Sequence, residues 1–285
     1  MPGTLYVVAT PIGNLEDVTL RALRVLGEVS LIAAEDTRRT ARLLQQYSIS
    51  TPTTSLHEHN EHARSQRLIE RLLAGDSIAL VSDAGTPVIS DPGARLISDA
   101  HERGIRVEPV PGANAAVAAV SAAGIPGEGF VFVGFAPSRP KARKSWLQKL
   151  AREPRPLVIY EAPHRIVAML EDVASELGNR KVAVGRELTK VHEQLAVRPV
   201  QEWLVEPPVA RGEFTLVVAG YVEERTDARV PPTDAVVTQF FGQLTEIIGL
   251  GRREALKDTA EHFGWTARQV FAAVERQKCR AEDIK

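Results

Sequence analysis

Residues 79–93 read ALVSDAGTPVISDPG, a short apolar run that ends in Asp83 and turns at once into a loop rich in glycine, proline and aspartate. A continuous apolar run of this length is typical of a strand buried on both faces of a sheet. Glycine and proline make tight turns and allow a backbone to approach a ligand closely. The stretch therefore predicts a buried strand that ends in a stiff, acidic binding loop.

The same pattern recurs along the chain. The apolar runs, rich in valine and isoleucine, are LYVVA (5–9), VSLIAA (29–34), SIALV (77–81), IRVEPV (105–110), FVFVGF (130–135), PLVIY (156–160), KVAVG (181–185) and EFTLVVAG (213–220). Amphipathic stretches lie between them, marked by Leu20, Leu23 and Leu26, by Ile69, Leu72 and Leu73, and by Val167, Leu170 and Val173. Strands that alternate with helices predict an α/β fold with largely parallel sheets.

Two glycine- or proline-bearing stretches divide the chain. SAAGIPGEG (121–129) separates an expected α/β domain at 1–120 from a second at 121–225, and EERTDARVPPTD (223–234) precedes a small helical domain at 234–285. In that last domain two helices flank Gly-Trp-Thr, with Thr266 as the expected N-cap. Such a pair is either a simple docking element, which we favour, or a DNA-type helix-turn-helix.

Composition limits the classes of protein. The chain has 285 residues and a net charge of −1, so only a local patch could attract nucleic acid. One cysteine, Cys279, cannot form an internal disulfide, which favours a reducing compartment. The N-terminus lacks a basic signal-peptide region, and no run approaches the roughly 20 apolar residues of a membrane span. We expect a cytoplasmic protein without a membrane partner.

Several common sites are missing from the sequence. It contains no phosphate-binding P-loop, no dinucleotide-binding glycine fingerprint, no zinc-spaced cysteine and histidine cluster and no nucleophile elbow. His57, His59 and His62 lie close together, but surface histidines are favoured over a metal site, and we predict no metal.

Carboxylates stand where strands end. Glu35, Asp36, Asp83 and Glu161 occupy such positions, and ligands of open α/β sheets bind at the carboxyl ends of the strands. A carboxylate there could accept hydrogen bonds from ribose hydroxyls or favour a cation. It could also cap the next helix, and for Asp36 both roles remain open. Capping explains Asp83 less well, because no helix follows it directly.

Six motifs in order carry a resemblance to a known family: TPIGNLEDVTLRA (10–22), AEDTRRT (34–40), SDAGTPVISDPG (82–93), PVPGANA (109–115), YEAPHR (160–165) and RELTKVHEQ (186–194). Together they resemble the tetrapyrrole-methylase superfamily of S-adenosylmethionine-dependent methyltransferases over roughly residues 3 to 222. Within it they resemble the branch that 2'-O-methylates the ribose of a cytidine in the decoding region of 16S rRNA. Asp-Ala-Gly-Thr-Pro stands where tetrapyrrole-modifying relatives tend to have a Gly-Asp-Pro core, which favours the rRNA branch.

The resemblance implies two α/β domains with S-adenosylmethionine folded in the cleft between them, and a homodimer. It places the cofactor beside residues of the strand-end loops, and many of these residues would contact the cofactor through their backbone groups. Carried over by position, these residues are Pro11, Asp83, Ala84, Gly85, Thr86, Val88, Ile89, Ala115, Ala116, Tyr160, Glu161, Leu188 and Thr215.

A bulky RNA needs cations for its phosphates and an aromatic side chain for an unpaired base. The stretch PSRPKARKSWLQK (137–149) offers both without an acid, and further clusters lie in the AEDTRRT and YEAPHR motifs. We expect contact with the 16S rRNA of the small ribosomal subunit, although a solvated helix start with Trp146 in the core, or surface salt bridges, would explain the same residues. The candidate RNA-binding residues are Arg38, Arg39, Arg139, Lys141, Arg143, Lys144, Trp146, His164 and Arg165.

Transfer of a methyl group to a ribose 2'-oxygen requires a group that takes the hydroxyl proton. The candidates are Asp36, Asp83, Glu161, Glu187 and Lys190, with Glu187 preferred, and a lysine would serve only if burial lowered its pKa. Alternatives are a methyltransferase for a tetrapyrrole or corrin precursor or a modified protein side chain, and a non-catalytic RNA-binding protein on the same scaffold. A nucleotide-binding oxidoreductase is more distant, because the dinucleotide fingerprint is missing.

Overall fold

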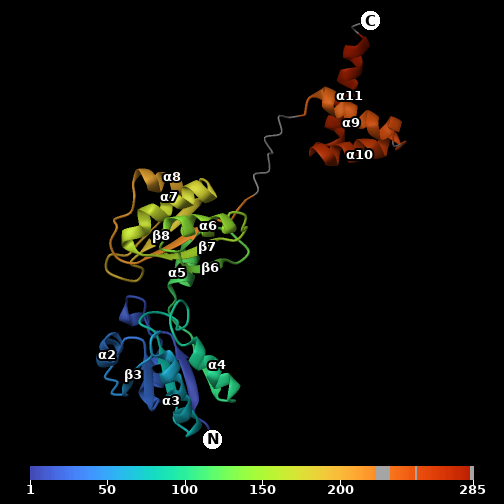
Figure 1. Ribbon diagram of the computed structural model, residues 1–285. Helices are drawn as coiled ribbons and strands as arrows, with labels where there is room; N and C mark the ends of the chain where they lie inside the picture. Colours follow the sequence, from blue (N-terminus) through green and yellow to red (C-terminus); the bar gives the residue numbers. More distant parts are fainter. Residues whose placement is uncertain (223–231, 248, 283–285) are drawn as a thin grey trace. The chain divides into compact units, whose positions relative to one another are not determined.

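The computed structural model describes residues 1–222, 232–247 and 249–282, shown in Figure 1. These residues form two compact units, Met1–Tyr221 and the part that begins at Val222. Most of the predicted joint at 223–234, and the side chain of Cys279, lie outside the described residues. None of the described helices combines the length and the apolar character that crossing a membrane requires.

The first sheet is wholly parallel, with the strand order β3-β2-β4-β1-β5. Its strands are β1 (Thr4–Val8), β2 (Leu31–Ala34), β3 (Thr53–Ser55), β4 (Ile78–Val81) and β5 (Arg106–Val110). The short edge strand β3 was not predicted, because Thr-Thr-Ser gives no apolar run.

Helices cover both faces of this sheet. They are α1 (Leu20–Glu28), α2 (Thr37–Gln46), α3 (Glu61–Leu73) and α4 (Ala94–Glu102), with a 3₁₀ turn at Leu15–Asp17. Successive strand residues point to opposite faces, so Leu31 and Ala33 of β2 pack with α3 and α4, whereas Ile32 and Ala34 pack with α1 and α2. This double burial explains why the strands are apolar without alternation.

The second sheet corrects one expectation. Its order is β6-β7-β10-β8-β9, and only β6 and β7 run parallel, while the other pairs are antiparallel. The strands are β6 (Val131–Phe135), β7 (Leu157–Glu161), β8 (Lys181–Arg186), β9 (Gln194–Pro199) and β10 (Phe214–Val218). "Largely parallel" therefore describes the first sheet, and the second is mixed.

Helices also cover both faces of the second sheet. They are α5 (Ala115–Ala123), α6 (Pro140–Leu150), α7 (Ile166–Leu177) and α8 (Val200–Val205), with a 3₁₀ turn at Pro163–Arg165. Alanines of α5 pack against Val158, Ala183 and Val217 of this sheet. The boundary expected after residue 120 thus falls inside α5, which packs on the second sheet although the chain reaches it directly from the first.

The C-terminal unit is helical, as predicted. It contains α9 (Asp234–Gly242), a π-helical turn at Gln243–Ile247, α10 (Arg252–Phe263) and α11 (Ala267–Glu282). Val237, Phe241 and Val270 belong to its small buried core. Thr266 is the N-cap of α11, because its Oγ1 accepts a hydrogen bond from the backbone N–H of Gln269 at 3.3 Å.

The basic stretch 137–149 is less available to RNA than its sequence indicates. Arg143 is buried, and its Nε donates to Oδ2 of Asp172 at 2.6 Å, so the prediction that it binds RNA is wrong. Trp146 packs against the core of the second sheet, as the alternative interpretation had it. Lys144 is half-exposed and also pairs with Asp172, while Arg139 and Lys141 remain exposed.

Arg143→Met should lower the free energy of unfolding by about 3 kcal/mol, because it leaves the buried Asp172 carboxylate with only the half-exposed Lys144. Lys144→Met, the matched control, should cost less than about 1 kcal/mol. Adding Asp172→Leu to Arg143→Met should restore most of the stability. Urea unfolding followed by circular dichroism measures all three, and equal losses for Arg143→Met and Lys144→Met would contradict the assignment.

Candidate functional site

Hydrogen bonds tie together the loops that follow β1, β4 and β5. The backbone N–H of Thr10 donates to the carbonyl of Gly85 at 2.9 Å, and that of Gly85 donates back at 3.0 Å. Thr86 Oγ1 donates to the carbonyl of Ala113 at 3.2 Å. Gly85 has φ +79°, and a Cβ there would lie 3.2 Å from a methyl of Ile12, so glycine suits both the conformation and the close approach. The three loops form one platform at the carboxyl ends of the first sheet.

A cavity of about 410 Å³ lies on this platform and is bounded on its other side by residues of the second sheet. That size is typical of a site for a small molecule or cofactor. From the first sheet its walls include Ile12, Glu35, Arg39, Ala84, Asp91 and Asn114, and from the second they include Phe135, Tyr160, Glu161, Leu188, Glu213 and Thr215.

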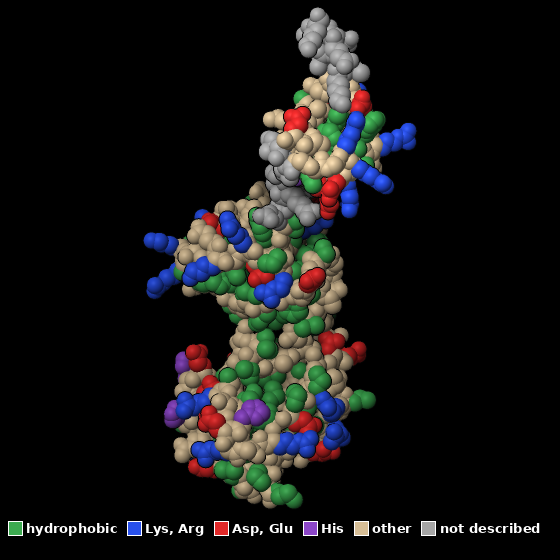
Figure 2. Space-filling model, turned by 90° about the vertical axis from the view of Figure 1, so that its right-hand side faces the viewer, with side chains coloured by type: hydrophobic (Ala, Val, Ile, Leu, Met, Phe, Trp, Pro, Cys, Tyr) green, Lys and Arg blue, Asp and Glu red, His purple; other side chains and the backbone are tan. Residues whose placement is uncertain are grey.

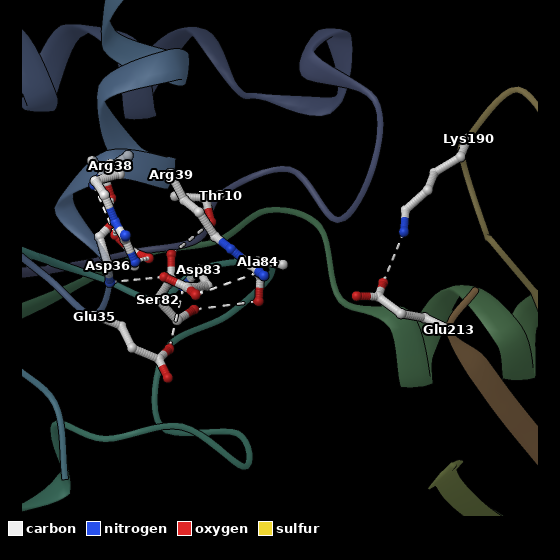
Figure 3. Close-up of polar contacts among 11 residues, drawn as sticks. Thr10, Glu35, Asp36, Arg38, Arg39, Ser82, Asp83, Ala84, Lys190 and Glu213 are labelled. Carbon is white, nitrogen blue, oxygen red and sulfur yellow. Dashed lines mark hydrogen bonds and ion pairs between the residues drawn. The ribbon is translucent and has the colours of Figure 1, made fainter. Parts of the chain in front are cut away.

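Carboxylates dominate one wall of the cavity, and the structure shifts their ionisation. Burial, together with the nearby charges of Glu35 and Asp83, raises the pKa of Asp91 to about 6. Burial and the charge of Asp83 also raise the pKa of Glu35. Asp83 links the group, because its Oδ1 accepts the backbone N–H of Asp36 at 2.8 Å and its own N–H lies 3.4 Å from Oε2 of Glu35 (Figure 3). A cation bound beside these carboxylates would offset the repulsion between their negative charges.

Glu161 lines the same cavity with a buried, half-satisfied carboxylate. Its Oε1 accepts from the N–H of Ala162 and from Nε of Arg165, each at 2.7 Å. Its Oε2 is buried and has no hydrogen-bond partner among the described residues. A buried oxygen without a partner is costly, so this atom indicates a ligand that brings a donor.

Strained backbone marks the loops on both sides of the cavity. Val88 and Ser90 have φ +72° and +70° in the loop after β4, and Glu187 and Thr189 have φ +50° and +67° in the loop after β8. Left-handed conformations are unfavourable for side chains with a Cβ and tend to gather at functional sites.

Most of the predicted cofactor residues come together here. Those that line the cavity are Asp83, Ala84, Gly85, Thr86, Ile89, Ala115, Tyr160, Glu161, Leu188 and Thr215. Pro11 lines an adjoining cavity instead. Val88 packs on the core of the first sheet, and Ala116 is buried, with its N–H donating to the Tyr160 hydroxyl at 3.2 Å.

Contacts within the protein shift the pKa values of three of the proposed proton acceptors away from the range that favours a general base. Asp36 caps α2, and hydrogen bonds from the side chain and backbone of Arg38 hold the pKa of its carboxyl far below the usual range. Burial opposes the charge of Lys190, but hydrogen bonds to Glu187 and Glu213 outweigh it and raise the pKa of Lys190, contrary to the condition set for a lysine base. Burial also opposes the charge of Glu187, yet Lys190 and the N–H of Glu213 lower its pKa.

The predicted RNA-binding arginines of the loops divide into two groups. Arg38 is 89% exposed but pairs with Asp36 at 2.8 Å, and Arg165 pairs with Glu161 at 2.6 Å. Arg39 lines the cavity and lies 3.4 Å from Asp83, whereas His164 is exposed. Over the first sheet domain, basic and acidic side chains are interspersed on the face shown in Figure 2, in keeping with the low net charge.

The sequence analysis missed several lining residues. Asp91 stands in the opening stretch but received no role, although its place in a strand-end loop was a signal. Phe135 and Ala162 could have been found in the same way, because they lie at or next to the carboxyl ends of observed strands, whereas Phe214 is the first residue of β10. Glu213 precedes β10 instead of following it, and no motif marks it.

Comparisons with known proteins agree with this geometry. A sequence model of the family described as Tetrapyrrole (Corrin/Porphyrin) Methylases matches residues 4–203. A protein of Pseudomonas aeruginosa named ribosomal RNA small subunit methyltransferase I is 50% identical over 77% of this chain and 79% of its own length. One of the same name from Haemophilus influenzae is 46% identical over 95% of this chain and 96% of its own. Among solved structures, uroporphyrin-III C-methyl transferase from Thermus thermophilus complexed with S-adenosyl homocysteine has a TM-score of 0.55 at 19% identity, over 76% of this chain and 97% of that one, and shares the fold.

Asp91→Asn should stabilise the ligand-free protein at pH 8 and have little effect at pH 4. The folded-state pKa of Asp91 is about 6, above its ordinary value of 3.8, so ionisation costs stability as the pH rises through this interval. After allowance for solvent screening we expect a gain of about 1 kcal/mol, or about 2–4 °C in Tm. Thermal unfolding at both pH values measures it, with the exposed Asp17→Asn as control. A gain that is equal at pH 4 and pH 8 would contradict the prediction.

Proposed function

We propose that this chain, which belongs to the tetrapyrrole (corrin/porphyrin) methylase family and is an S-adenosylmethionine-dependent methyltransferase, methylates the 2'-oxygen of a cytidine ribose in the decoding region of 16S rRNA. The observation that carries the proposal is the 410 Å³ cavity with its raised-pKa carboxylates and the unpaired Glu161 oxygen. The rRNA acceptor is supported by the name of relatives that are 46–50% identical to the chain.

The residues of the cavity fit the methyl donor. S-adenosylmethionine supplies an activated methyl group on a cationic sulfur, and it also carries amine and hydroxyl hydrogen-bond donors. The carboxylates Glu35, Asp83 and Asp91 favour a cation beside them. Oε2 of Glu161 accepts one of the donors, while Arg165 holds the carboxylate in place from the other side.

The same carboxylates are suited to accept the proton of the acceptor hydroxyl. A general base works best when its pKa lies near the operating pH, and the pKa of about 6 for Asp91 meets this condition better than the lowered pKa values of Asp36 and Glu187. Asp83, whose charge is among those that raise the pKa of Asp91, lies on the wall shared with the adjoining cavity. Positioning of the hydroxyl supplies the rest of the rate enhancement.

Two further assignments belong to this proposal. The single cysteine favours a reducing compartment such as the cytoplasm, and the family resemblance favours a homodimer. A tetrapyrrole acceptor remains the alternative within the family. The likeness to the uroporphyrin-III C-methyl transferase of Thermus thermophilus, at 19% identity, bears on the fold alone and does not distinguish the two acceptors.

Glu161→Gln should weaken the binding of S-adenosylhomocysteine tenfold to a hundredfold, since hydrogen bonds to charged groups contribute about 1.5–3 kcal/mol. Titration calorimetry measures the Kd, and circular dichroism checks the fold. Glu171→Gln, the same change at an exposed position of α7, should leave the Kd unchanged. A wild-type Kd for Glu161→Gln would remove Glu161 from the cofactor site.

The reaction itself is tested with small ribosomal subunits from a strain that lacks this gene. Methyl-labelled S-adenosylmethionine and the wild-type protein should yield labelled 2'-O-methylcytidine after digestion of the 16S rRNA to nucleosides. Label on a base, or on a different nucleoside, would overturn the 2'-O-cytidine assignment. No label in rRNA but label in uroporphyrinogen III would favour the tetrapyrrole alternative.

A further inference from the structure

A second cavity of about 320 Å³ adjoins the first. It is formed by the loop after β1, by α2 and by the strand-end residues Lys190 and Glu213 of the second sheet domain. The two cavities share the wall residues Ile12, Arg39, Asp83, Ala84 and Glu213. Molecules bound in the two cavities would therefore meet across this wall, which is the arrangement that transfer of a group from one to the other requires.

The electrostatic character of the second cavity is opposite to that of the first. Arg39, Arg42 and Lys190 line it, whereas the acids Glu35, Asp91 and Glu161 line only the first cavity. Its own acids, Asp83 and Glu213, are both on the shared wall. The first cavity thus favours a cation, and the second favours an anion.

The cations of the second cavity are available in different degrees. Arg42 is exposed and forms no ion pair within the described part of the chain. Arg39 lies 3.4 Å from Asp83, a long contact, and its side chain is 62% exposed. Lys190 Nζ lies 2.9 Å from carboxylate oxygens of both Glu187 and Glu213, so it stays charged and is paired with both. Figure 3 shows its contact with Glu213.

The backbone at Gly13 passes very close to the Lys190 side chain. A Cβ on Gly13 would lie 2.5 Å from Cγ of Lys190 and 2.8 Å from Oγ1 of Thr189. The loop after β1 therefore passes directly over the Lys190 side chain, which brings a cation of the second sheet domain to a cavity formed mainly by the first. Thr189, which is in the left-handed conformation, belongs to the same contact.

We propose that the second cavity is the acceptor-nucleotide subsite, in which Arg39, Arg42 and Lys190 bind a phosphate next to the reacting ribose. This inference rests on the proposed function for the identity of the acceptor, but the anion site follows from the cavity alone. Arginine suits a phosphate because its guanidinium donates two hydrogen bonds in one plane. An RNA nucleotide turned out of its stack would place its phosphate against these cations and its 2'-oxygen at the shared wall.

Arg42→Glu tests the subsite, because Arg42 contacts only the second cavity. With S-adenosylhomocysteine present, cytidine 3',5'-bisphosphate should bind the wild-type protein and bind Arg42→Glu at least about tenfold more weakly, since a charge-assisted contact is lost. The Kd of S-adenosylhomocysteine should not change. Arg67→Glu is the matched control, since Arg67 is an exposed arginine on α3 that lines neither cavity.

Methylation of small ribosomal subunits gives the second measurement. Arg42→Glu should raise the KM for subunits about tenfold at unchanged kcat, and Arg42→Ala should lower the slope of log binding constant against log salt by about one relative to wild type. Equal effects of Arg67→Glu and Arg42→Glu would indicate general surface charge and overturn the subsite. Binding of the bisphosphate that Arg42→Glu abolishes, in a protein that methylates no rRNA, would leave the anion site standing and overturn the proposed function instead.

Discussion

The reciprocal hydrogen bonds between Thr10 and Gly85 are the contact on which both cavities depend. They join the loops after two neighbouring parallel strands, and Thr86 extends the connection to Ala113 after a third. A parallel sheet brings the carboxyl ends of its strands to one edge, but only such cross-links make one surface of three separate loops. Ile12, Ala84 and Gly85, which lie in or beside this platform, line the first cavity, and two of them line both.

In the proposed reaction, the separation of charge across the shared wall would allow a chain with a net charge of −1 to bind an anionic acceptor. Its electrostatic attraction is local, because the acids Glu35, Asp91 and Glu161 line only the first cavity. Gathering Glu35, Asp83 and Asp91 costs stability, as the raised pKa values of Glu35 and Asp91 record. Such a cost is typical of a functional site, and here it favours a ligand that brings a positive charge.

The sequence predicts the parts of this structure that depend on local pattern. Eight of the ten strands in the described part of the chain coincide with apolar runs, and the loops that follow them contain most of the cavity wall. Strand direction in the second sheet was not predictable in this way, because a doubly buried strand is apolar whether its neighbours run parallel or antiparallel. The role of Arg143 was hidden for another reason: its partner Asp172 lies on a different helix, and a basic stretch does not reveal which of its side chains turn inward. The raised pKa of Asp91 was hidden as well, because it depends on burial and on the charge of Glu35, which follows a different strand.

The strained residues connect these observations. Val88 and Ser90 lie in the loop after β4, and Glu187 and Thr189 lie in the loop after β8, so both sides of the first cavity contain backbone that would relax if it were free. Each loop is held by contacts that do not depend on a ligand: Val88 packs on the core, and Glu187 is fixed by Lys190 and by the N–H of Glu213. A cavity shaped in this way exists before its ligand arrives, so less ordering is required on binding. The same fixation gives Glu187 and Glu213 a structural role, since they hold Lys190 charged beside the second cavity. In the proposed reaction, proton acceptance then falls to the less tightly paired carboxylates of the first cavity.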